Sequence, residues 1–189
     1  MEKIRFLWHS LKNFQQMGTV IRSGSAMCAK MTHFIDHNKD LVIVELGAGD
    51  GVITSHILHK MSPNARLYVF EINPELCAVV SKINDHRMTL INDGAQYMEA
   101  HLQKHGIHQV DTIISALPFM MLPDELTQEI LILSKKVLRT NGLFIQMHYA
   151  KKISKMYKSI FGNVHINNVP INIPPGYVFR CVKEKHPKD

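Results

Sequence analysis

The chain has 189 residues, of which 46% are hydrophobic and 20% charged, and its formal net charge is +6. At roughly 150 residues per domain this length corresponds to one domain with a short appendage, and the composition excludes a disordered chain, a collagen and a coiled coil. No apolar run approaches the ~18 residues needed to cross a bilayer, and the first residues lack the apolar block of a secretory signal. We therefore expect a cytoplasmic protein, whose positive charge suits nucleic acid and an acidic membrane surface equally.

Residues 1–38 are predicted to form two helices outside the main domain. Apolar residues of the first helix recur at three- or four-residue intervals on one face: Ile4, Leu7, Trp8, Leu11 and Phe14. A second helix is predicted over 26–37, with Ser25 or a neighbour as its N-cap. The first helix, with basic residues beside its apolar face, is expected to lie in a membrane interface. The alternative is that it packs on the protein's own sheet or covers a cofactor.

Residues 39–189 are predicted to form one α/β domain. Its first five strands are apolar throughout and are expected at 41–46, 67–71, 88–92, 110–115 and 143–148. Helices are expected between and after them, at 51–60, 74–84, 95–104, 123–138 and 150–160. Such alternation indicates a parallel sheet covered on both faces.

The last two predicted strands, 164–169 and 177–182, are joined only by a loop, which indicates an antiparallel hairpin. Five alternating units closed by a hairpin resemble the order of class I methyltransferases. We therefore expect a Rossmann-like fold with a mostly parallel seven-stranded sheet, a C-terminal antiparallel hairpin and helices on both faces.

A glycine-rich loop follows the first strand. Glu45 lies at the strand end, and Gly47, Gly49 and Gly51 occupy alternate positions before a helix. Glycines let a ligand lie against the backbone, and the carboxyl edge of an open parallel sheet is where such folds bind ligands. The dinucleotide fingerprint requires glycine where Val52 stands, which argues against a nicotinamide cofactor. The loop is instead similar to the S-adenosyl-L-methionine (SAM) site of class I methyltransferases; the alternative is a tight turn without a ligand.

Acidic residues end the next two strands. Glu71 is predicted to accept hydrogen bonds from both ribose hydroxyls of the cofactor, as in dinucleotide folds, and Ile72 to pack on the adenine ring. Asp93, followed by Gly94 and Ala95, is predicted to read the adenine edge with its side chain and a backbone amide. The alternatives are an exposed strand-end acid for Glu71 and a helix cap for Asp93.

The fourth strand ends in Ser115, at the position that faces the transferred methyl group in this fold. Adenine N6-methyltransferases carry Asn or Asp there, so the chain lacks the amide that would hold an exocyclic adenine amine. The apolar run 117–122 favours an apolar acceptor, against the alternative of ordinary core before a helix.

No metal or disulfide is expected. The chain has 12 histidines, but no carboxylate or cysteine pattern completes a metal site. The three cysteines are far apart and are predicted to be free buried thiols: Cys28, Cys77 and Cys181.

Four segments together resemble the bacterial phospholipid N-methyltransferases. These are 18–25, similar to the family's G-A-x-x-P-S-S loop, 115–118 to its S-G-L-P, 146–149 to its Q-x-x-Y and 172–176 to its N-L-P-P-A. Arg22, Gly24 and Gly176 depart from these patterns, which leaves the exact lipid open between phosphatidylethanolamine and a related lipid such as an ornithine lipid. The resemblance covers almost the whole chain.

The resemblance implies SAM-dependent methylation of the amine headgroup of a membrane lipid, with phosphatidylethanolamine as the expected substrate. It places Ser23 and Ser115 at the cofactor and makes Ser115 and Tyr149 the catalytic residues at the acceptor, with His148 as a weaker candidate. Because a dry apolar pocket would lower the pKa of the substrate amine, no indispensable general base is expected. It also implies a peripheral protein at the inner face of the membrane, held on an anionic surface by its N-terminal helix, without nucleic acid or an obligate protein partner. The alternatives are an RNA adenine N6-methyltransferase, a small-molecule methyltransferase and a non-catalytic lipid- or SAM-binding module.

Overall fold

Seven strands form one sheet in the order β3-β2-β1-β4-β5-β7-β6 in a computed structural model, which describes residues 24–185. The strands are β1 Val42–Leu46, β2 Arg66–Phe70, β3 Met88–Ile91, β4 Val110–Ser115, β5 Leu138–His148, β6 His165–Val169 and β7 Gly176–Val182. β1 to β5 are parallel, and β7 is antiparallel to both β5 and β6. This topology confirms the predicted Rossmann-like methyltransferase fold.

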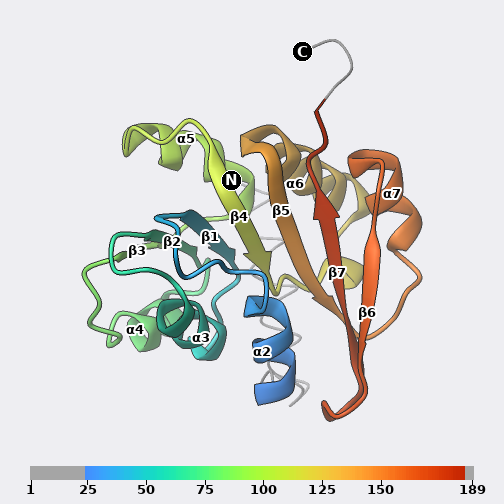
Figure 1. The fold of residues 1–189 in the computed structure, drawn as a ribbon, viewed down its shortest axis with the longest axis horizontal. Coiled ribbons are helices and arrows are strands. Elements are labelled where there is room, and N and C mark those ends of the chain that lie inside the picture. The colour runs from blue at the N-terminus through green and yellow to red at the C-terminus, as the bar shows by residue number, and fades with distance from the viewer. Residues whose placement is uncertain (1–23, 186–189) are drawn as a thin grey trace.

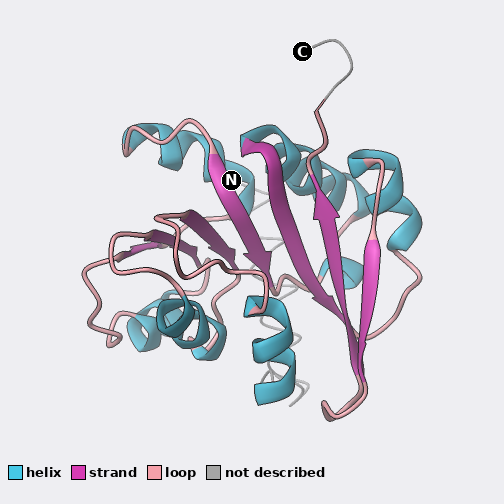
Figure 2. Ribbon diagram, in the orientation of Figure 1, coloured by secondary structure: helices cyan, strands magenta, loops and turns pink. Residues whose placement is uncertain are grey.

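Helices cover both faces of the sheet (Figure 2). The α-helices are α2 Ser25–Thr32, α3 Val52–Lys60, α4 Pro74–Val80, α5 Met98–Lys104, α6 Asp124–Val137 and α7 Ser154–Phe161, and the short 3₁₀ turns are η1 Ala95–Tyr97 and η2 Phe119–Met121. Figure 1 shows α2, α3 and α4 on the near side of the sheet, and α6 behind it. Because β4 and β5 run towards the edge from which β7 starts, the β6–β7 turn lies at the carboxyl edge of the parallel strands.

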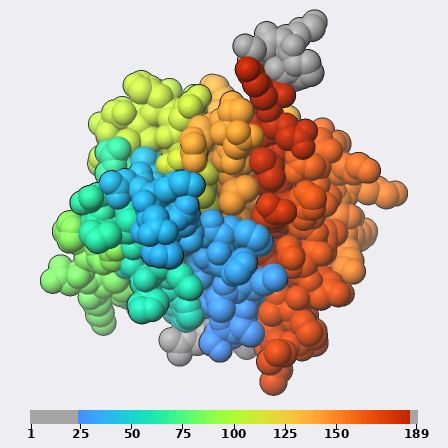
Figure 3. Space-filling model, in the orientation of Figure 1, coloured from blue at the N-terminus to red at the C-terminus, as the bar shows by residue number. Residues whose placement is uncertain are grey.

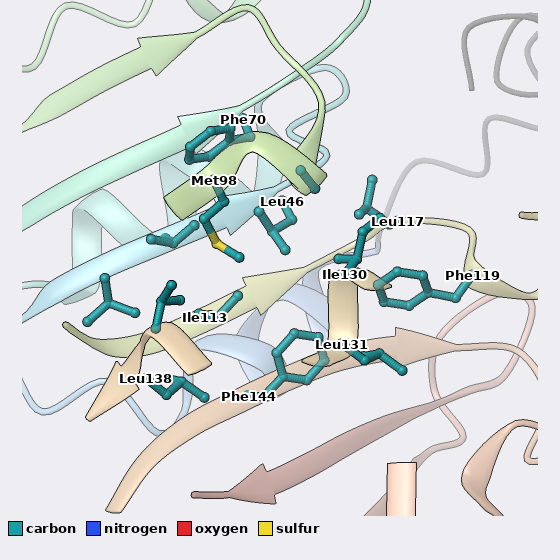
Figure 4. Packing of buried hydrophobic residues seen from close by; sticks show 14 of the residues in the cluster. Leu46, Phe70, Met98, Ile113, Leu117, Phe119, Ile130, Leu131, Leu138 and Phe144 are labelled. Carbon is teal, nitrogen blue, oxygen red and sulfur yellow. The ribbon is translucent and has the colours of Figure 1, made fainter. Parts of the chain in front are cut away.

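Two hydrophobic clusters, one on each face, bury the sheet. Leu46 and Phe144 belong to the cluster under α5, α6 and α7 (Figure 4), and Ile43 belongs to the cluster under α2 and α3. Side chains alternate between the two faces of a strand with a period of two, so a strand buried on both faces has to be apolar throughout. This is the physical reason why the apolar runs predicted the strands.

β5 is longer than its predicted range. It begins at Leu138, directly after α6, and includes Asn141, whose φ is 64°. An Asn-Gly pair is typical of tight turns. Here, however, the N–H of Asn141 donates to the Lys183 carbonyl at 2.7 Å, and the N–H of Lys183 donates to the Gly142 carbonyl at 3.0 Å. Pairing with the residue that follows β7 therefore continues the strand through a sequence that is typical of a turn.

Helices α2, α4 and α7 are shorter than their predicted ranges 26–37, 74–84 and 150–160. Gly24, and not Ser25, is the N-cap of α2, and no side chain caps that helix. After α4 the chain turns so that the Arg87 guanidinium can donate to the Leu58 carbonyl at 2.9 Å and pair with Asp85 at 2.6 Å. These tertiary contacts end the helix earlier than its sequence pattern indicates.

The predicted N-terminal region enters the structure only at its end. Met27, Cys28 and Met31 of α2 are fully buried in the cluster that also holds Ile43. The predicted helix over residues 4–14 and the proposed cofactor residue Ser23 lie outside the described residues, so a division at 38 stays a prediction. All three cysteines are buried thiols that form no disulfide, as predicted.

Among residues 24–185, no helix is long and apolar enough to cross a membrane.

Candidate active site

The loop between β1 and α3 turns through three glycines in the left-handed region, with φ 77° at Gly47, 58° at Gly49 and 81° at Gly51. A Cβ at Gly47 would lie 3.0 Å from the Leu117 side chain, and one at Gly51 would lie 2.9 Å from that of Ile83. At Gly49 it would meet no described atom within 4 Å. Two of the glycines therefore serve the protein's own packing, whereas Gly49 borders open space where a ligand can approach the backbone.

Glu71, directly after β2, fixes this loop. Its Oε2 accepts a hydrogen bond from the backbone N–H of Gly49 at 2.9 Å, and its Oε1 accepts one from that of Asn73 at 2.8 Å. Burial raises the pKa of Glu71, and these N–H groups oppose the rise. Because each carboxylate oxygen can accept two hydrogen bonds, Glu71 keeps acceptor capacity for ligand hydroxyls.

Glu45 is a buried carboxyl group without a clear partner. Its side chain is 1% exposed, and neither carboxyl oxygen makes a well-aligned hydrogen bond to a described residue, although the Thr54 hydroxyl is nearby. Burial, with a smaller contribution from the charge of Glu71, raises the pKa of Glu45 to about 8. An unsatisfied buried polar group costs free energy, so this carboxyl group is suited to a cationic group of a ligand.

Asp93, after β3, bonds to the next element of the chain. Its Oδ1 accepts a hydrogen bond from the N–H of Gly94 at 2.8 Å, and its Oδ2 lies 2.8 Å from Nε2 of His101 on α5. The cap of η1 is Gly94, and no side chain caps that turn, so the helix-cap alternative for Asp93 is wrong. Gly94 and Ala95 are buried beside it.

Sequence reasoning missed two residues at this end of the site. The amide of Asn92 donates to the carbonyls of Glu71 at 2.9 Å and Ile72 at 3.2 Å, which ties the loop after β2 to the loop after β3. Its position directly before Asp93 is a signal that could have identified it. His101 lies eight residues beyond Asp93, and the packing of α5 on the sheet, where the His101 ring lies beside that of Phe70 on β2, brings the two together.

Ser115 ends β4 on the other half of the edge, with no exposed surface. In the strand register it pairs with Leu46 of β1 and with Gln146 of β5. Its Oγ accepts a hydrogen bond from the N–H of Leu117 at 3.3 Å, and the Gln146 amide donates to the Leu117 carbonyl at 2.9 Å. The other amide atom, Oε1 of Gln146, is buried without a hydrogen-bond partner among the described residues.

The wall around Ser115 is apolar. Leu117 and Phe119 are buried and belong to the cluster that also holds Leu46 (Figure 4). Beyond them Met120 and Met121 are exposed. This half of the edge therefore offers a small number of fixed polar atoms in an apolar surrounding.

His148 and Tyr149 are neighbours in the chain but take different places. His148 is buried, and its Nε2 lies 2.9 Å from the Tyr157 hydroxyl; burial lowers the pKa of His148 to about 4. Tyr149 lies past the end of β5 and is 37% exposed. Its ring approaches Gly176, and burial raises the pKa of Tyr149, a rise that the nearby Asn172 amide partly offsets.

Within residues 24–185, no group of three or more His, Cys, Asp or Glu side chains is arranged to hold a metal ion. The candidate site is thus a cradle of backbone amides and carboxylates at β1 to β3 next to an apolar wall at β4 and β5.

Comparisons with known proteins agree with this geometry. The sequence pattern of the methyltransferase small domain family matches residues 21–169. An ornithine lipid N-methyltransferase of Singulisphaera acidiphila is 31% identical over 148 residues, which are 76% of this chain and 77% of that protein. A ribosomal RNA small subunit methyltransferase H of Christiangramia forsetii is 32% identical over 80 residues, or 42% of this chain and 26% of that protein.

Among solved structures, a 1,6-didemethyltoxoflavin-N1-methyltransferase of Burkholderia thailandensis, with bound S-adenosylhomocysteine, has a TM-score of 0.72 at 12% identity. The match covers 95% of this chain and 88% of that one. At this identity the likeness concerns the fold.

Proposed function

The chain belongs to the methyltransferase small domain family and is a SAM-dependent methyltransferase, and we propose that it methylates the amine headgroup of a membrane lipid. The observation that carries this proposal is the apolar wall at Ser115, where Leu117 and Phe119 are buried and no Asn or Asp is present to hold an adenine amine. The similarity to an ornithine lipid N-methyltransferase over 76% of the chain supports it. Phosphatidylethanolamine and an ornithine lipid are the two headgroups to test.

We assign the cofactor to the β1–β3 half of the edge. The open space at Gly49 allows a ligand to approach the backbone, with Gly47 and Gly51 shaping the same loop. Glu71 has acceptor capacity for the ribose hydroxyls, and the unpaired carboxyl group of Glu45 suits the cationic amino end of the cofactor.

The adenine is assigned to the neighbouring loop. Ile72, which is half-buried, supplies an apolar surface for the ring. Asp93 and the backbone of Gly94 and Ala95 supply the polar atoms that read its edge, with Asp93 held in place by His101. Ser23 stays a predicted cofactor residue outside the described part of the chain.

Bound SAM supplies an electrophilic methyl group, and the chain's own residues have to present a neutral amine to it. An alkyl amine resembles Lys, with a pKa of about 10.4, so at neutral pH it is mostly a protonated cation without a free lone pair. The apolar wall of Leu117 and Phe119 disfavours the cation and lowers the amine pKa. We assign to Ser115 and to the unpaired Oε1 of Gln146 the hydrogen bonds that orient the amine, and correct placement supplies most of the rate acceleration.

Tyr149 is proposed to contact the headgroup or its phosphate, since its hydroxyl is near Asn172 and its side chain is partly exposed. His148 has no such role in the proposal, because its Nε2 is paired with Tyr157 inside the core. We place the protein at the inner face of the membrane as a peripheral protein.

The test follows radiolabelled methyl groups from SAM into the organic extract of vesicles that contain phosphatidylethanolamine or an ornithine lipid. We expect label in one of these lipids with the parent chain and none with Gly49→Val. Ribosomal RNA and small amines are tested in parallel as acceptors. Label in RNA or in small amines, and in no lipid, would overturn the lipid assignment while leaving the methyltransferase intact.

A further inference from the structure

The loop between β6 and β7 exposes two large apolar side chains. Ile171 is 83% exposed and Ile173 is 87% exposed, which makes them the most exposed large hydrophobic residues of the described chain. Their apolar surface stays in contact with water, so neither isoleucine contributes the hydrophobic stabilisation that burial would give.

The loop is nevertheless held in a defined shape. Asn172, between the two isoleucines, is 2% exposed, and its Nδ2 donates to the Pro174 carbonyl at 2.7 Å. Its backbone N–H donates to the carbonyl of Val169 at 3.3 Å. Because the middle residue is turned inward and fixed, its two neighbours are presented outward together.

This loop lies at the same edge of the sheet as the candidate site. It starts from the end of β6 and leads to Gly176, against which the Tyr149 ring lies. In Figure 3 the end of this hairpin projects from the lower side of the molecule, beyond α2. A surface that contacts the two isoleucines would therefore face the acceptor half of the edge.

The stretch of sequence that includes the loop is basic. Residues 130–183 contain nine Lys or Arg and no Asp or Glu, whereas the whole chain has a net charge of only +6. Three residues of this stretch belong to the opposite end of the sheet, where β5 begins and β7 ends: Lys136, Arg139 and Lys183. Lys151 and Lys152 are exposed in the segment after β5, and Nζ of Lys151 lies 4.8 Å from the centre of the Tyr177 ring at the start of β7, next to the loop. Basic side chains are thus placed beside the apolar tip.

We propose that the β6–β7 loop inserts Ile171 and Ile173 into the acyl boundary of an anionic lipid surface, while Lys151 and Lys152 contact the lipid phosphates. The inference rests on the proposed lipid substrate and extends it, because it identifies the surface that brings the acceptor side of the site to the membrane. Transfer of an exposed isoleucine side chain from water into the acyl boundary is favourable, and each Lys near an anionic membrane strengthens binding. RNA would account for the lysines and leave the isoleucines unexplained.

The test measures co-sedimentation of the full chain with vesicles of phosphatidylglycerol and phosphatidylcholine, which contain no primary or secondary amine and so report binding without turnover. We expect Ile171→Ser and Ile173→Ser each to weaken partitioning about tenfold. Ile132→Ser is the matched control, because Ile132 is 57% exposed on α6, away from the loop; it should stay within about twofold of the parent. Lys151→Gln with Lys152→Gln should weaken binding to these vesicles but not to vesicles of phosphatidylcholine alone.

A second measurement separates this surface from the proposed function. Methyl transfer to a short-chain amine lipid, dissolved as monomers, should be unchanged in the two loop variants, whereas transfer to the same headgroup in vesicles should fall with binding. Loop variants that bind vesicles as well as Ile132→Ser overturn the inference, whether or not a lipid is methylated. Loop-dependent vesicle binding by a chain that methylates no lipid would leave the surface standing and overturn the proposed substrate. A parent chain that binds RNA and not vesicles overturns both.

Discussion

The two halves of the sheet's carboxyl edge hold their polar groups in different ways. At β1 to β3 the carboxylates of Glu71 and Asp93 accept hydrogen bonds from backbone N–H groups of the loops, at 2.8 to 2.9 Å. At β4 and β5 the polar groups are uncharged, and Ser115 and Gln146 bond to the backbone of Leu117 among buried apolar residues. The first arrangement suits a polar cofactor with many hydroxyl and amine groups, and the second suits an amine that has to lose its proton.

Each half also contains one buried titratable group that burial keeps neutral. The pKa of Glu45 is raised to about 8, and that of His148 is lowered to about 4, for the same reason, since burial penalises the charged form of either group. The difference is in their partners. His148 is bonded to Tyr157 within the protein, whereas the oxygens of Glu45 have no hydrogen-bond partner among the described residues, so of these two groups only Glu45 can pair with a ligand.

The largest expected effect is a loss of SAM affinity on substitution of Gly49, which changes only the cofactor half of the edge. Gly49→Val should weaken SAM binding by at least about 100-fold, because a β-branched side chain fills the open space at Gly49. The matched control is Gly106→Val: Gly106 has φ 71° and also faces open space, but it lies after α5. Both variants should lose about 1–2 kcal/mol of stability from left-handed strain. Calorimetric titration with SAM and thermal unfolding measure both quantities, and equal SAM affinity in the two variants would contradict the cradle.

A pH series sharpens the contrast between Glu45 and His148. Because the folded pKa of Glu45 is raised, its contribution to stability is present at low pH and is lost as pH rises towards 8. Between pH 7 and 8, where His148 is mostly neutral in both the folded and the unfolded state, the parent should lose about 1 kcal/mol of unfolding free energy.

Glu45→Gln should remove this slope, since glutamine has nearly the shape of the protonated carboxyl group and does not titrate. The control Glu75→Gln, at an exposed position on α4, should keep the slope of the parent. Urea unfolding at several pH values measures it. An unchanged slope in Glu45→Gln would assign the pH dependence to another group.

A smaller effect is expected in the acceptor half, where Tyr149 is proposed to contact the headgroup. Tyr149→Phe should lower kcat/KM for the lipid about tenfold, the equivalent of one hydrogen bond to the headgroup, and should leave SAM affinity unchanged. Tyr177→Phe is the control, because it removes the same hydroxyl group from a tyrosine that lies beside Lys151 and has no proposed contact with the headgroup. Steady-state kinetics with vesicle substrate provide the comparison. A loss of SAM affinity in Tyr149→Phe would contradict the assignment of Tyr149 to the headgroup.

The smallest expected effect is that of removing the buried hydrogen bond between His148 and Tyr157. Tyr157→Phe removes the hydroxyl that lies 2.9 Å from Nε2 of His148 and should cost about 1 kcal/mol of unfolding free energy. Methyl transfer should stay within about twofold of the parent. A loss of activity as large as that of Tyr149→Phe would give His148 a part in the reaction that its place in the core does not suggest.

Much of the candidate site was predictable because its parts are local in the chain. The glycines follow β1 directly, and Glu71 and Asp93 stand at strand ends, so each strand run also identified the residue at its carboxyl end. The partners of these residues were not predictable. His101 reaches Asp93 from α5, and Gln146 lies beside Ser115 through the register of β4 and β5, which no spacing in the sequence records.

The sequence by itself determined the order of strands and helices, the antiparallel hairpin and the glycine-rich loop, because strands buried on both faces need continuous apolar runs and a tight turn needs glycine. Only the tertiary structure decided where the helices end, which buried groups have partners and that Ile171 and Ile173 project beside the acceptor half. Those outcomes depend on contacts between segments far apart in the chain, where packing and hydrogen bonds outweigh local preference.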